Sequence, residues 1–504
     1  MSSGASAAQR ENRDSALEKM VQVQVVLPSG KSSTLELPQC SKIGDLKILA
    51  QKSFGQGFLK LVKVADLAGA DLAASLEAAG IRDGDSLTAV VCQAKVRASR
   101  NAFALWCSGD RMITWGDPKE VGENSAVIQD QLKGVEHVQT TRSAFAAILA
   151  DGSVITWGQP NYGSDSSGVQ DQLKGVQQIQ ATEAAFAAIL KDGSVITWGN
   201  PDLGGDSSRV QHQLRNVQKV QATETAFAAI RSDGSVITWG KQNAGGDSSA
   251  VQDQLKSVQQ IQATLSAFAA ILEDRSVITW GDPYYGGDSS KVQHQLRSVE
   301  KVQATTCAFA AILADGPVIT WGYPDAGGDS SRVEHELKSV QQIQATDSAF
   351  AAILSDGSVI AWGVPEKGGD NSAVQDQLKG VQQIQATGSA FAAILEDGSV
   401  VTWGHPPSGG DCSAVQDRLK NVHQIQATHD AFAAVTADGS VIAWGKPRFG
   451  GDSSAVQDQL KGVQQVHASD SSFLAILQDG SVVTWGCPFS GGDSSAVQDQ
   501  FATL

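Results

Sequence analysis

One pattern of apolar and polar positions recurs along most of the chain, and its clearest copy occupies residues 176–199. It starts with Val-Gln-Gln-Ile-Gln-Ala-Thr, continues with the apolar run Ala-Phe-Ala-Ala-Ile-Leu at 185–190 and ends with Val-Ile-Thr-Trp-Gly at 195–199. Apolar runs of this length predict β-strands, and Asp192-Gly193 between the last two favours a tight hairpin. We expect a fourth, weaker strand or a turn of helix at segments such as 169–173.

The Trp-Gly pair that ends each copy gives the period of the repeat. The pair occurs ten times, 41 residues apart after a first step of 42, and the extra residue is Ile128. Residues 93–504 therefore contain ten units, and four antiparallel strands per unit, arranged radially, describe the blades of a β-propeller. We expect the tryptophans to pack within and between blades. They are Trp115, Trp157, Trp198, Trp239, Trp280, Trp321, Trp362, Trp403, Trp444 and Trp485.

Ten units are compatible with three arrangements, because propellers usually have about four to eight blades. The units could form one large ring, two smaller rings or an open β-solenoid in which copies stack as rungs. We favour the ring forms over the solenoid. Equivalent glutamines would form a polar ring in a propeller or a ladder in a solenoid; they are Gln139, Gln180, Gln221, Gln262, Gln303, Gln344, Gln385 and Gln426.

Residues 20–92 have a different pattern. Two alternating runs within 21–37, separated by a Leu-Pro-Ser-Gly turn, predict a β-hairpin. A helix should follow, with Ser41 as its N-cap and Gly55 at its end. Two further strands are expected, the last of them at 86–91.

This order of hairpin, helix and strands resembles the ubiquitin-like β-grasp family over residues 20–92. The resemblance implies an α+β fold and an apolar recognition patch at Leu27, Val62 and Val90. A transferable modifier of that family ends in a free Gly-Gly, whereas this chain continues through Cys92-Gln93 into the repeats. We therefore expect a fixed module that is recognised by other proteins and is never transferred to them.

The repeats in residues 93–504 resemble those of the regulator-of-chromosome-condensation (RCC) family. The resemblance is carried by Trp-Gly before a Gly-containing loop, then Val-x-x-x-Leu, Val-x-x-Ile-x-Ala, an apolar strand and Asp-Gly. It implies a propeller. The units are shorter than the family's usual blade, Gly-Gly-Asp-Ser-Ser replaces a Gly-Gln-Leu-Gly loop, and Ala-Phe replaces a His before the apolar strand. These departures affect the fold less than the family's best-known activity, nucleotide exchange on a small GTPase. Ubiquitin ligases of the HECT type also carry such repeats, but no HECT domain is visible here.

Charge and composition narrow the function classes. The net charge of −16 and the isoelectric point near 4.9 oppose nucleic acids and anionic membranes as partners. Six cysteines at unrelated positions indicate neither disulfides nor zinc. Without a long apolar run or a signal peptide, we expect a soluble protein of the cytoplasm or nucleus. Residues 1–19 lack periodicity, which predicts a disordered tail.

The ten copies differ mainly in two loops. One lies between Trp-Gly and Gly-Gly, and the other precedes Ala-Phe, as at Glu183, Leu265, Asp347 and His429. Since repeat proteins bind through loops displayed on a constant frame, the aromatic and arginine residues of the first loop are our candidates for partner contact. They are Tyr162, Tyr284, Tyr285, Tyr323, Arg448 and Phe449.

No pattern indicates catalysis, a cofactor or a metal. Ser, His and Asp do not recur as a set, and no phosphate-binding glycine motif is present. The aspartate after each Gly-Gly is more typical of a turn cap than of a calcium ligand, because each copy supplies only one carboxylate. These are Asp165, Asp206, Asp247, Asp288, Asp329, Asp370, Asp411, Asp452 and Asp493. Two hairpins depart from Asp-Gly: Arg275 replaces the glycine, and Gly109-Asp110 reverses the order.

The sequence therefore predicts a mainly β protein with an N-terminal ubiquitin-like domain and a ten-unit propeller-like body. We interpret it as a non-enzymatic scaffold or adaptor of the ubiquitin pathway, with ubiquitin receptors or ligase components as protein partners. The alternatives are a guanine-nucleotide exchange factor or other regulator of a small GTPase, and an accessory component of a ubiquitin ligase.

Overall fold

The computed structural model describes residues 19–62, 74–107, 111–121 and 131–501, which divide into two compact units. One unit consists mainly of Met1–Gln93, and the other mainly of Ala94–Leu477 and Val482–Gln498. The predicted tail up to residue 18, Gly109-Asp110 and Ile128 lie outside the described residues. Within the described residues, no helix is long and apolar enough to cross a lipid bilayer.

The first unit is a four-stranded sheet packed against one helix. Its strands, in the spatial order β2-β1-β4-β3, are β1 (Met20–Val26), β2 (Ser32–Pro38), β3 (Leu59–Val62) and β4 (Ser86–Val91). β1 pairs antiparallel with β2 and parallel with β4, and β3 pairs antiparallel with β4. Val21, Val23 and Val25 alternate toward the core, as the period of two predicts. The predicted hairpin, helix and two further strands are all present.

Helix α1 (Ile43–Phe54) begins one residue later than the N-cap prediction placed it. Its N-cap is Lys42 instead of Ser41, and the amide of Lys42 donates to the carboxylate of Asp45 over 2.9 Å. The negative charge of Asp45 in the first turn also suits the helix dipole. Gly55 ends the helix at a φ of 61°, as predicted, because glycine adopts this left-handed conformation without steric cost.

The second unit contains ten three-stranded antiparallel sheets, which we number in chain order. In each sheet the three strands follow one another along the chain. The strands of the first five sheets are β5 (Ala94–Ala98), β6 (Ala102–Cys107), β7 (Met112–Gly116), β8 (Val135–Thr140), β9 (Ala144–Leu149), β10 (Val154–Gly158), β11 (Val176–Ala181), β12 (Ala185–Leu190), β13 (Val195–Gly199), β14 (Val217–Ala222), β15 (Ala226–Arg231), β16 (Val236–Gly240), β17 (Val258–Ala263), β18 (Ala267–Leu272) and β19 (Val277–Gly281). Those of the other five are β20 (Val299–Ala304), β21 (Ala308–Leu313), β22 (Val318–Gly322), β23 (Val340–Ala345), β24 (Ala349–Leu354), β25 (Val359–Gly363), β26 (Val381–Ala386), β27 (Ala390–Leu395), β28 (Val400–Gly404), β29 (Val422–Ala427), β30 (Ala431–Thr436), β31 (Val441–Gly445), β32 (Val463–Ala468), β33 (Ser472–Leu477) and β34 (Val482–Gly486).

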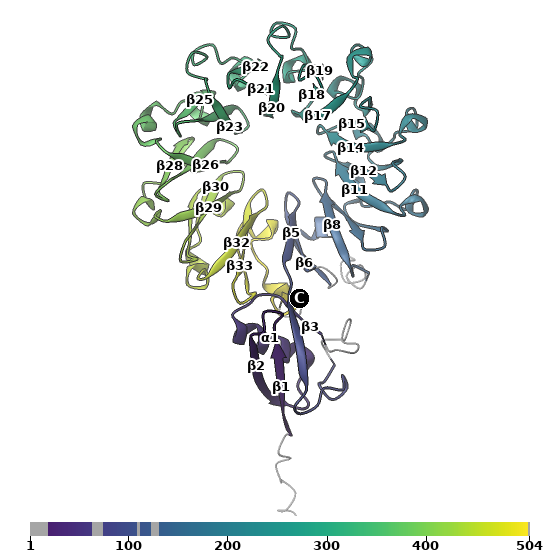
Figure 1. Ribbon diagram of the computed structural model, residues 1–504, viewed down its shortest axis with the longest axis vertical. Coiled ribbons are helices and arrows are strands. Elements are labelled where there is room, and N and C mark those ends of the chain that lie inside the picture. The colour runs from purple at the N-terminus through teal and green to yellow at the C-terminus, as the bar shows by residue number, and fades with distance from the viewer. Residues whose placement is uncertain (1–18, 63–73, 108–110, 122–130, 502–504) are drawn as a thin grey trace, which may run out of the picture. The chain divides into compact units, whose positions relative to one another are not determined.

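The ten sheets form one ring, so two smaller rings and the open solenoid are excluded. The first strands of consecutive sheets contact one another and surround the centre of the ring (Figure 1). The tenth sheet meets the first. There the indole nitrogen of Trp115 donates to the carbonyl of Gly491 over 3.0 Å, and Ser490 hydrogen-bonds Asn101 over 3.0 Å.

The core of the ring lies between neighbouring sheets. The second strand of each sheet is buried on both faces: Ala185 and Ala187 of the third sheet pack against Phe227 and Trp239 of the fourth. Small residues on one face thus make room for the large rings of the next sheet. Phe227 also stacks on Trp239, and the equivalent Phe and Trp rings stack in all ten sheets at 5.0–5.5 Å. The predicted packing role of the tryptophans is confirmed.

The fourth strand is absent from the described sheets. Its segment is a short turn of helix, the other form that the pattern allowed, in seven sheets, and a turn without helix in the fifth and sixth. At Gln170–Gln172 the side-chain amide of Gln170 donates to the carbonyl of Val154 over 2.9 Å and so occupies an edge group that a fourth strand would pair with. The same bond recurs in seven later sheets. The helical segments are η2 (Gln170–Gln172), η4 (Gln211–Gln213), η6 (Gln252–Gln254), η10 (Ser372–Gln377), η12 (Gln416–Arg418), η14 (Ser454–Gln459) and, both after the tenth sheet, η16 (Ser495–Val497) and α4 (Gln498–Phe501).

The hairpin between the second and third strands requires a left-handed residue. Gly234 has a φ of 75°, and a Cβ there would lie 2.5 Å from the Cα of Ser257 in the next unit. Arg275, which replaces the hairpin glycine, occupies the equivalent place with a φ of 63°. Its guanidinium lies 3.5 Å from the carboxylate of Glu300.

Candidate functional site

Both variable loops of the repeat lie at the same end of the sheets. We call the turn between the first and second strands the mouth turn, and the loop after the third strand the exit loop. In the third sheet, Thr182 of the mouth turn donates through Oγ1 to the carbonyl of Leu203 in the exit loop over 2.9 Å. Equivalent bonds of 2.9–3.2 Å join the two loops in eight other sheets. The constant hairpins, such as Asp192-Gly193, are at the opposite ends of the strands.

The exit loops contain short turns of helix. The first has α2 (Pro118–Val121), and the others have η1 (Pro160–Tyr162), η3 (Pro201–Leu203), η5 (Gln242–Ala244), η7 (Pro283–Tyr285), η8 (Pro324–Ala326), η9 (Pro365–Lys367), η11 (Pro406–Ser408), η13 (Pro447–Phe449) and η15 (Pro488–Ser490). Each of the nine later turns is closed by a glycine in the left-handed conformation. The glycine leaves room for the phenylalanine ring of the next sheet: a Cβ on Gly204 would lie 2.6 Å from Phe227.

We call the circle of residues formed by one position of each mouth turn the mouth ring. Hydrogen bonds of 2.8–3.2 Å link the main chains of nine of the ten turns, because the amide in each turn from Arg142 to His429 donates to the carbonyl in the next, ending at Asp470. These eight bonds hold the turns independently of the side chains. The mouth ring consists of Arg100, Arg142, Glu183, Glu224, Leu265, Thr306, Asp347, Gly388, His429 and Asp470.

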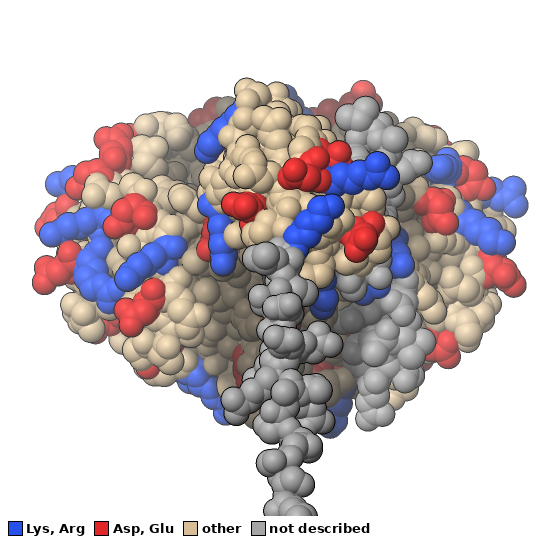
Figure 2. Space-filling model, turned by 90° about the horizontal axis from the view of Figure 1, so that it is seen from below, with Lys and Arg blue, Asp and Glu red and all other residues tan. Residues whose placement is uncertain are grey.

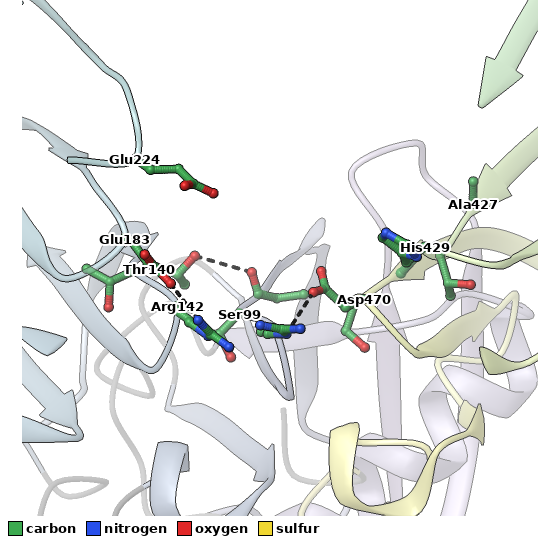
Figure 3. Close-up of a pocket in the computed structure, with 14 residues that line it drawn as sticks. Ser99, Thr140, Arg142, Glu183, Glu224, Ala427, His429 and Asp470 are labelled. Carbon is green, nitrogen blue, oxygen red and sulfur yellow. Dashed lines mark hydrogen bonds and ion pairs between the residues drawn. The ribbon is translucent and has the colours of Figure 1, made fainter. Parts of the chain in front are cut away.

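The mouth ring surrounds open space. One cavity of about 590 Å³ is lined by Arg100, Arg142, Glu183, His429 and Asp470 among others (Figure 3). A second, of about 570 Å³, is lined by mouth turns from the third to the ninth sheet. Because both are lined by Glu183, Glu224 and His429, they are parts of one opening. The sequence comparison noted the variation in these turns but did not identify them as a site.

Each of the two arginines of the mouth ring forms an ion pair with another residue of the ring. Arg142 lies 2.6 Å from the carboxylate of Glu183, and this hydrogen bond raises the pKa of the arginine further. Arg100 lies 3.4 Å from Asp470, and this ion pair joins the first and last sheets. Partial burial nevertheless raises the pKa of Asp470. Burial, and then the nearby charge of Glu183, also raise the pKa of Glu224, which has no ion-pair partner among the described residues.

A third ion pair in the mouth ring joins the mouth turns of the seventh and ninth sheets and so spans the turn of the eighth. His429 Nε2 lies 3.4 Å from a carboxylate oxygen of Asp347, two mouth turns away, and its Nδ1 lies 3.4 Å from Asp430. Gly388 between them makes this possible, since a Cβ there would lie 2.8 Å from the imidazole and 2.9 Å from the carboxylate. The hydrogen bond with Asp347, and then that with Asp430, raise the pKa of His429 to about 9 despite partial burial.

Three of the predicted contact residues come together. Tyr284 and Tyr285 belong to the exit loop of the fifth sheet, and Tyr323 begins that of the sixth. The ring of Tyr284 is 4.2 Å from that of Tyr323 and 5.5 Å from that of Tyr285. The hydrogen bond to Tyr323 raises the pKa of Tyr284 to about 12. We call these residues the tyrosine cluster.

The other predicted residues of the repeats lie elsewhere around the ring. Tyr162 is half-buried in the exit loop of the second sheet. Arg448 and Phe449 share the exit loop of the ninth sheet, where Lys446 lies 4.8 Å from the centre of the Phe449 ring. Sequence comparison missed Phe489 of the next exit loop, whose ring is 73% exposed. Its signal was present, because Phe489 occupies the same variable position as Arg448 and Tyr284.

The apolar patch predicted on the first unit is only partly formed. Val62 and Val90 lie on the same side of the β3–β4 pair, opposite the core residues Leu59 and Leu61, and Val90 is 40% exposed. Leu27 is buried within the core instead, so it does not belong to this surface.

The repeated aspartates act as turn caps. Asp165 accepts the amide of Ser167 over 3.0 Å, and the equivalent bond recurs in eight later units. The side-chain hydrogen bond of Ser167, and then this amide bond, lower the pKa of Asp165. Among the described residues, no group of three or more His, Cys, Asp or Glu side chains is placed to hold a metal ion.

One polar network resembles a nucleophile arrangement, but its geometry does not suit catalysis. Ser408 lies between His405, 2.9 Å away, and Asp430, 2.6 Å away. The hydroxyl is buried and donates to the carboxylate, so its proton is directed away from the imidazole that would have to accept it. The network fixes the exit loop of the eighth sheet to the mouth turn of the ninth.

On the side shown in Figure 2, Lys and Arg side chains alternate with Asp and Glu side chains and form no large area of one sign.

No model of a known protein family matches the chain, and neither does any curated protein. Similar solved structures include Prp20p of Saccharomyces cerevisiae, at 14% identity and a TM-score of 0.31 over 61% of this chain and 89% of that one. They also include the ectodomain of the receptor kinase CR4 of Physcomitrella patens, at 16% identity and a TM-score of 0.30 over 52% and 70%. The computationally designed protein Ika8 has 14% identity and a TM-score of 0.29 over 62% and 96%. Similarities at this level carry no conclusion about activity or partners.

Proposed function

We propose that this chain is a non-enzymatic scaffold whose ring binds a protein partner through the end that carries the mouth turns and exit loops. The observation that supports this most is the placement of both variable loops at one end of the sheets, joined by the threonine hydrogen bonds. A constant frame that presents differing side chains on one surface is the usual construction of binding repeat proteins.

The residue types at this end suit a protein interface. Tyr284 and Phe489 are large, exposed aromatic side chains, and aromatic residues with arginine are the types that dominate binding energy in interfaces. The opening at the mouth ring is lined largely by polar and charged groups, which suits a protein segment better than a small apolar ligand.

The proposal is tested by quantitative capture of proteins on the immobilised full chain. Tyr284→Ser with Tyr285→Ser should reduce capture of the main partner, identified by mass spectrometry, by roughly tenfold or more. The matched control is Lys191→Ser with Glu273→Ser, two exposed residues at the hairpin end of the sheets. Equal losses in both variants, or no loss in either, would contradict the proposal.

A regulator of a small GTPase is the second candidate. It is suggested by the resemblance of the repeats to the RCC family, and the similar structure of Prp20p is described with binding properties to Gsp1p and histones. Release of a labelled guanine nucleotide from purified small GTPases would distinguish the two functions. A scaffold should leave the rate unchanged.

For the first unit we propose recognition by ubiquitin-binding receptors through the surface around Val62 and Val90. Its sheet order and the exposed Val90 support this role. The full chain should bind immobilised proteasomal ubiquitin receptors, and Val90→Asp should abolish that binding. The control Val91→Asp also changes an exposed valine of β4, so equal losses would show that the surface is not specific.

A further inference from the structure

The tyrosine cluster gathers three of the chain's four tyrosines in neighbouring exit loops. Tyr285 contributes to the core between the fifth and sixth sheets, which accounts for its aromatic ring. Tyr284 does not share that role, since 51% of it is exposed. Its ring instead lies against Tyr323, and together they present aromatic surface to the solvent.

Carboxylates flank the tyrosine cluster. Asp282 begins the same exit loop, and its Oδ1 accepts the amide of Tyr284 over 2.9 Å. Thr264 fixes the carbonyl of Tyr285 over 2.9 Å, and the next residue, Leu265, accepts the amide of Glu224 through its carbonyl over 3.2 Å. Burial, and then the nearby groups Cys307, Asp282 and Glu224, raise the pKa of Tyr285.

The exit loop of the ninth sheet shows which chemical group can bind at the position equivalent to the tyrosine cluster. In the equivalent exit loop of the ninth sheet, Phe449 occupies the position of Tyr285, and Lys446 occupies that of Asp282. The ammonium of Lys446 lies 4.8 Å from the Phe449 ring centre and 3.6 Å from the carboxylate of Asp430. A cation therefore occupies the ninth loop, held by an aromatic ring and a carboxylate. In the fifth loop an aspartate replaces the lysine, and no cation of the described chain lies over the rings.

We propose that the tyrosine cluster, with Asp282 and Glu224, binds an arginine side chain supplied by a segment of the protein partner. The inference rests on the proposed scaffold function and specifies the chemistry of the partner. A guanidinium stacks on tyrosine rings through its plane and hydrogen-bonds carboxylates through its edge. Burial, and then the nearby charge of Glu183, raise the pKa of Glu224, so a positive charge placed beside it would stabilise the ionised carboxylate.

The test measures fluorescence anisotropy of the full chain with a labelled Gly-Ser peptide that contains two arginines. The control peptides carry citrulline, the neutral analogue of arginine, or lysine. The arginine peptide should bind about fivefold to thirtyfold more tightly than the citrulline peptide, corresponding to a cation held by aromatic rings and carboxylates. Binding should weaken as salt is added. Equal binding of the arginine and citrulline peptides, preference for lysine, or absence of saturable binding would overturn the inference.

Variants of the chain locate the site. Tyr284→Ser and Glu224→Gln should each weaken the arginine peptide at least about fivefold, whereas Tyr162→Ser, which changes the remaining tyrosine in a distant exit loop, should not. Each variant should unfold at the temperature of the unchanged chain. If these variants bind normally while capture of the natural partner still depends on the exit loops, only the arginine site is wrong. If capture does not depend on the exit loops at all, the scaffold proposal is wrong.

Discussion

Trp115 in the first sheet donates a hydrogen bond of 3.0 Å to Gly491, 376 residues later in the last exit loop. The same bond joins neighbouring sheets elsewhere, as between Trp321 and Gly286, also at 3.0 Å. The junction between the first and last sheets therefore uses the same contact as eight of the other nine junctions. The ring should therefore behave as closed at the junction between its first and last sheets.

We expect Trp115→Phe to lower the free energy of unfolding by about 1–3 kcal/mol, because it leaves the buried carbonyl of Gly491 without its donor. Urea denaturation followed by circular dichroism measures this loss. Trp321→Phe is the matched control inside the ring and should cost a similar amount. A nearly neutral Trp115→Phe beside a costly Trp321→Phe would show that the junction is open in solution.

The junction between the first and second sheets depends on a buried carboxylate. Glu120, which is 2% exposed, accepts from the hydroxyls of Ser99 and Ser143 over 2.7 and 3.1 Å, and from the amide and side chain of Asn101 over 3.1 and 2.8 Å. Glu120→Ala should lower the free energy of unfolding by roughly 3 kcal/mol, since four donors lose their acceptor. Glu120→Gln keeps one acceptor oxygen and should cost less. An equal cost for both, measured by denaturation, would assign the effect to packing.

The hairpin at Arg275 should be improved by glycine. A left-handed residue with a Cβ costs roughly 1–2 kcal/mol, and the exposed ion pair with Glu300 returns only about 0.5 kcal/mol. Arg275→Gly should therefore raise the melting temperature in calorimetry. Gly316→Ala in the next hairpin, where a Cβ would lie 2.6 Å from the Cα of Ser339, should lower it. A drop for Arg275→Gly would show that this turn is held by other contacts.

Protonation of His429 should make stability depend on pH. Its folded pKa of about 9 lies above the ordinary value of 6.5, so the stability from its contacts with Asp347 and Asp430 is complete below pH 6.5 and is lost as the pH rises through about 9. Because about half of the side chain is exposed, we expect a contribution below about 1 kcal/mol. The difference in unfolding free energy between the unchanged chain and His429→Gln should shrink over this range. A constant difference would contradict the raised pKa.

Much of the ring could be predicted from the sequence, because each unit repeats its signals. The alternation in 195–199, the Asp192-Gly193 turn and the spacing of the tryptophans determine three strands and ten units. The segment after the exit loop was ambiguous, since Val-Gln-Asp-Gln-Leu is compatible with either a strand or a turn. Side-chain hydrogen bonds such as that of Gln170 to Val154 decide between them, and no local pattern reveals these bonds.

The candidate site could be predicted only in part. Comparison of the copies found both variable loops and the residues of the tyrosine cluster. It could not show that Tyr284 meets Tyr323, or that His429 reaches Asp347 past Gly388, because these contacts join different units and depend on the angle between sheets. The sequence also could not show which loop side chains are exposed to solvent, and Phe489 is an example.

The mouth turns are linked by main-chain hydrogen bonds, which do not depend on which side chain each turn carries. A substitution at Leu265 or Thr306 changes what the opening presents, while the amide and carbonyl that hold the turn remain. Closely similar repeats can therefore acquire a different surface by single changes at one position per unit. If the ring is the scaffold proposed above, its choice of partner can change without rebuilding the fold.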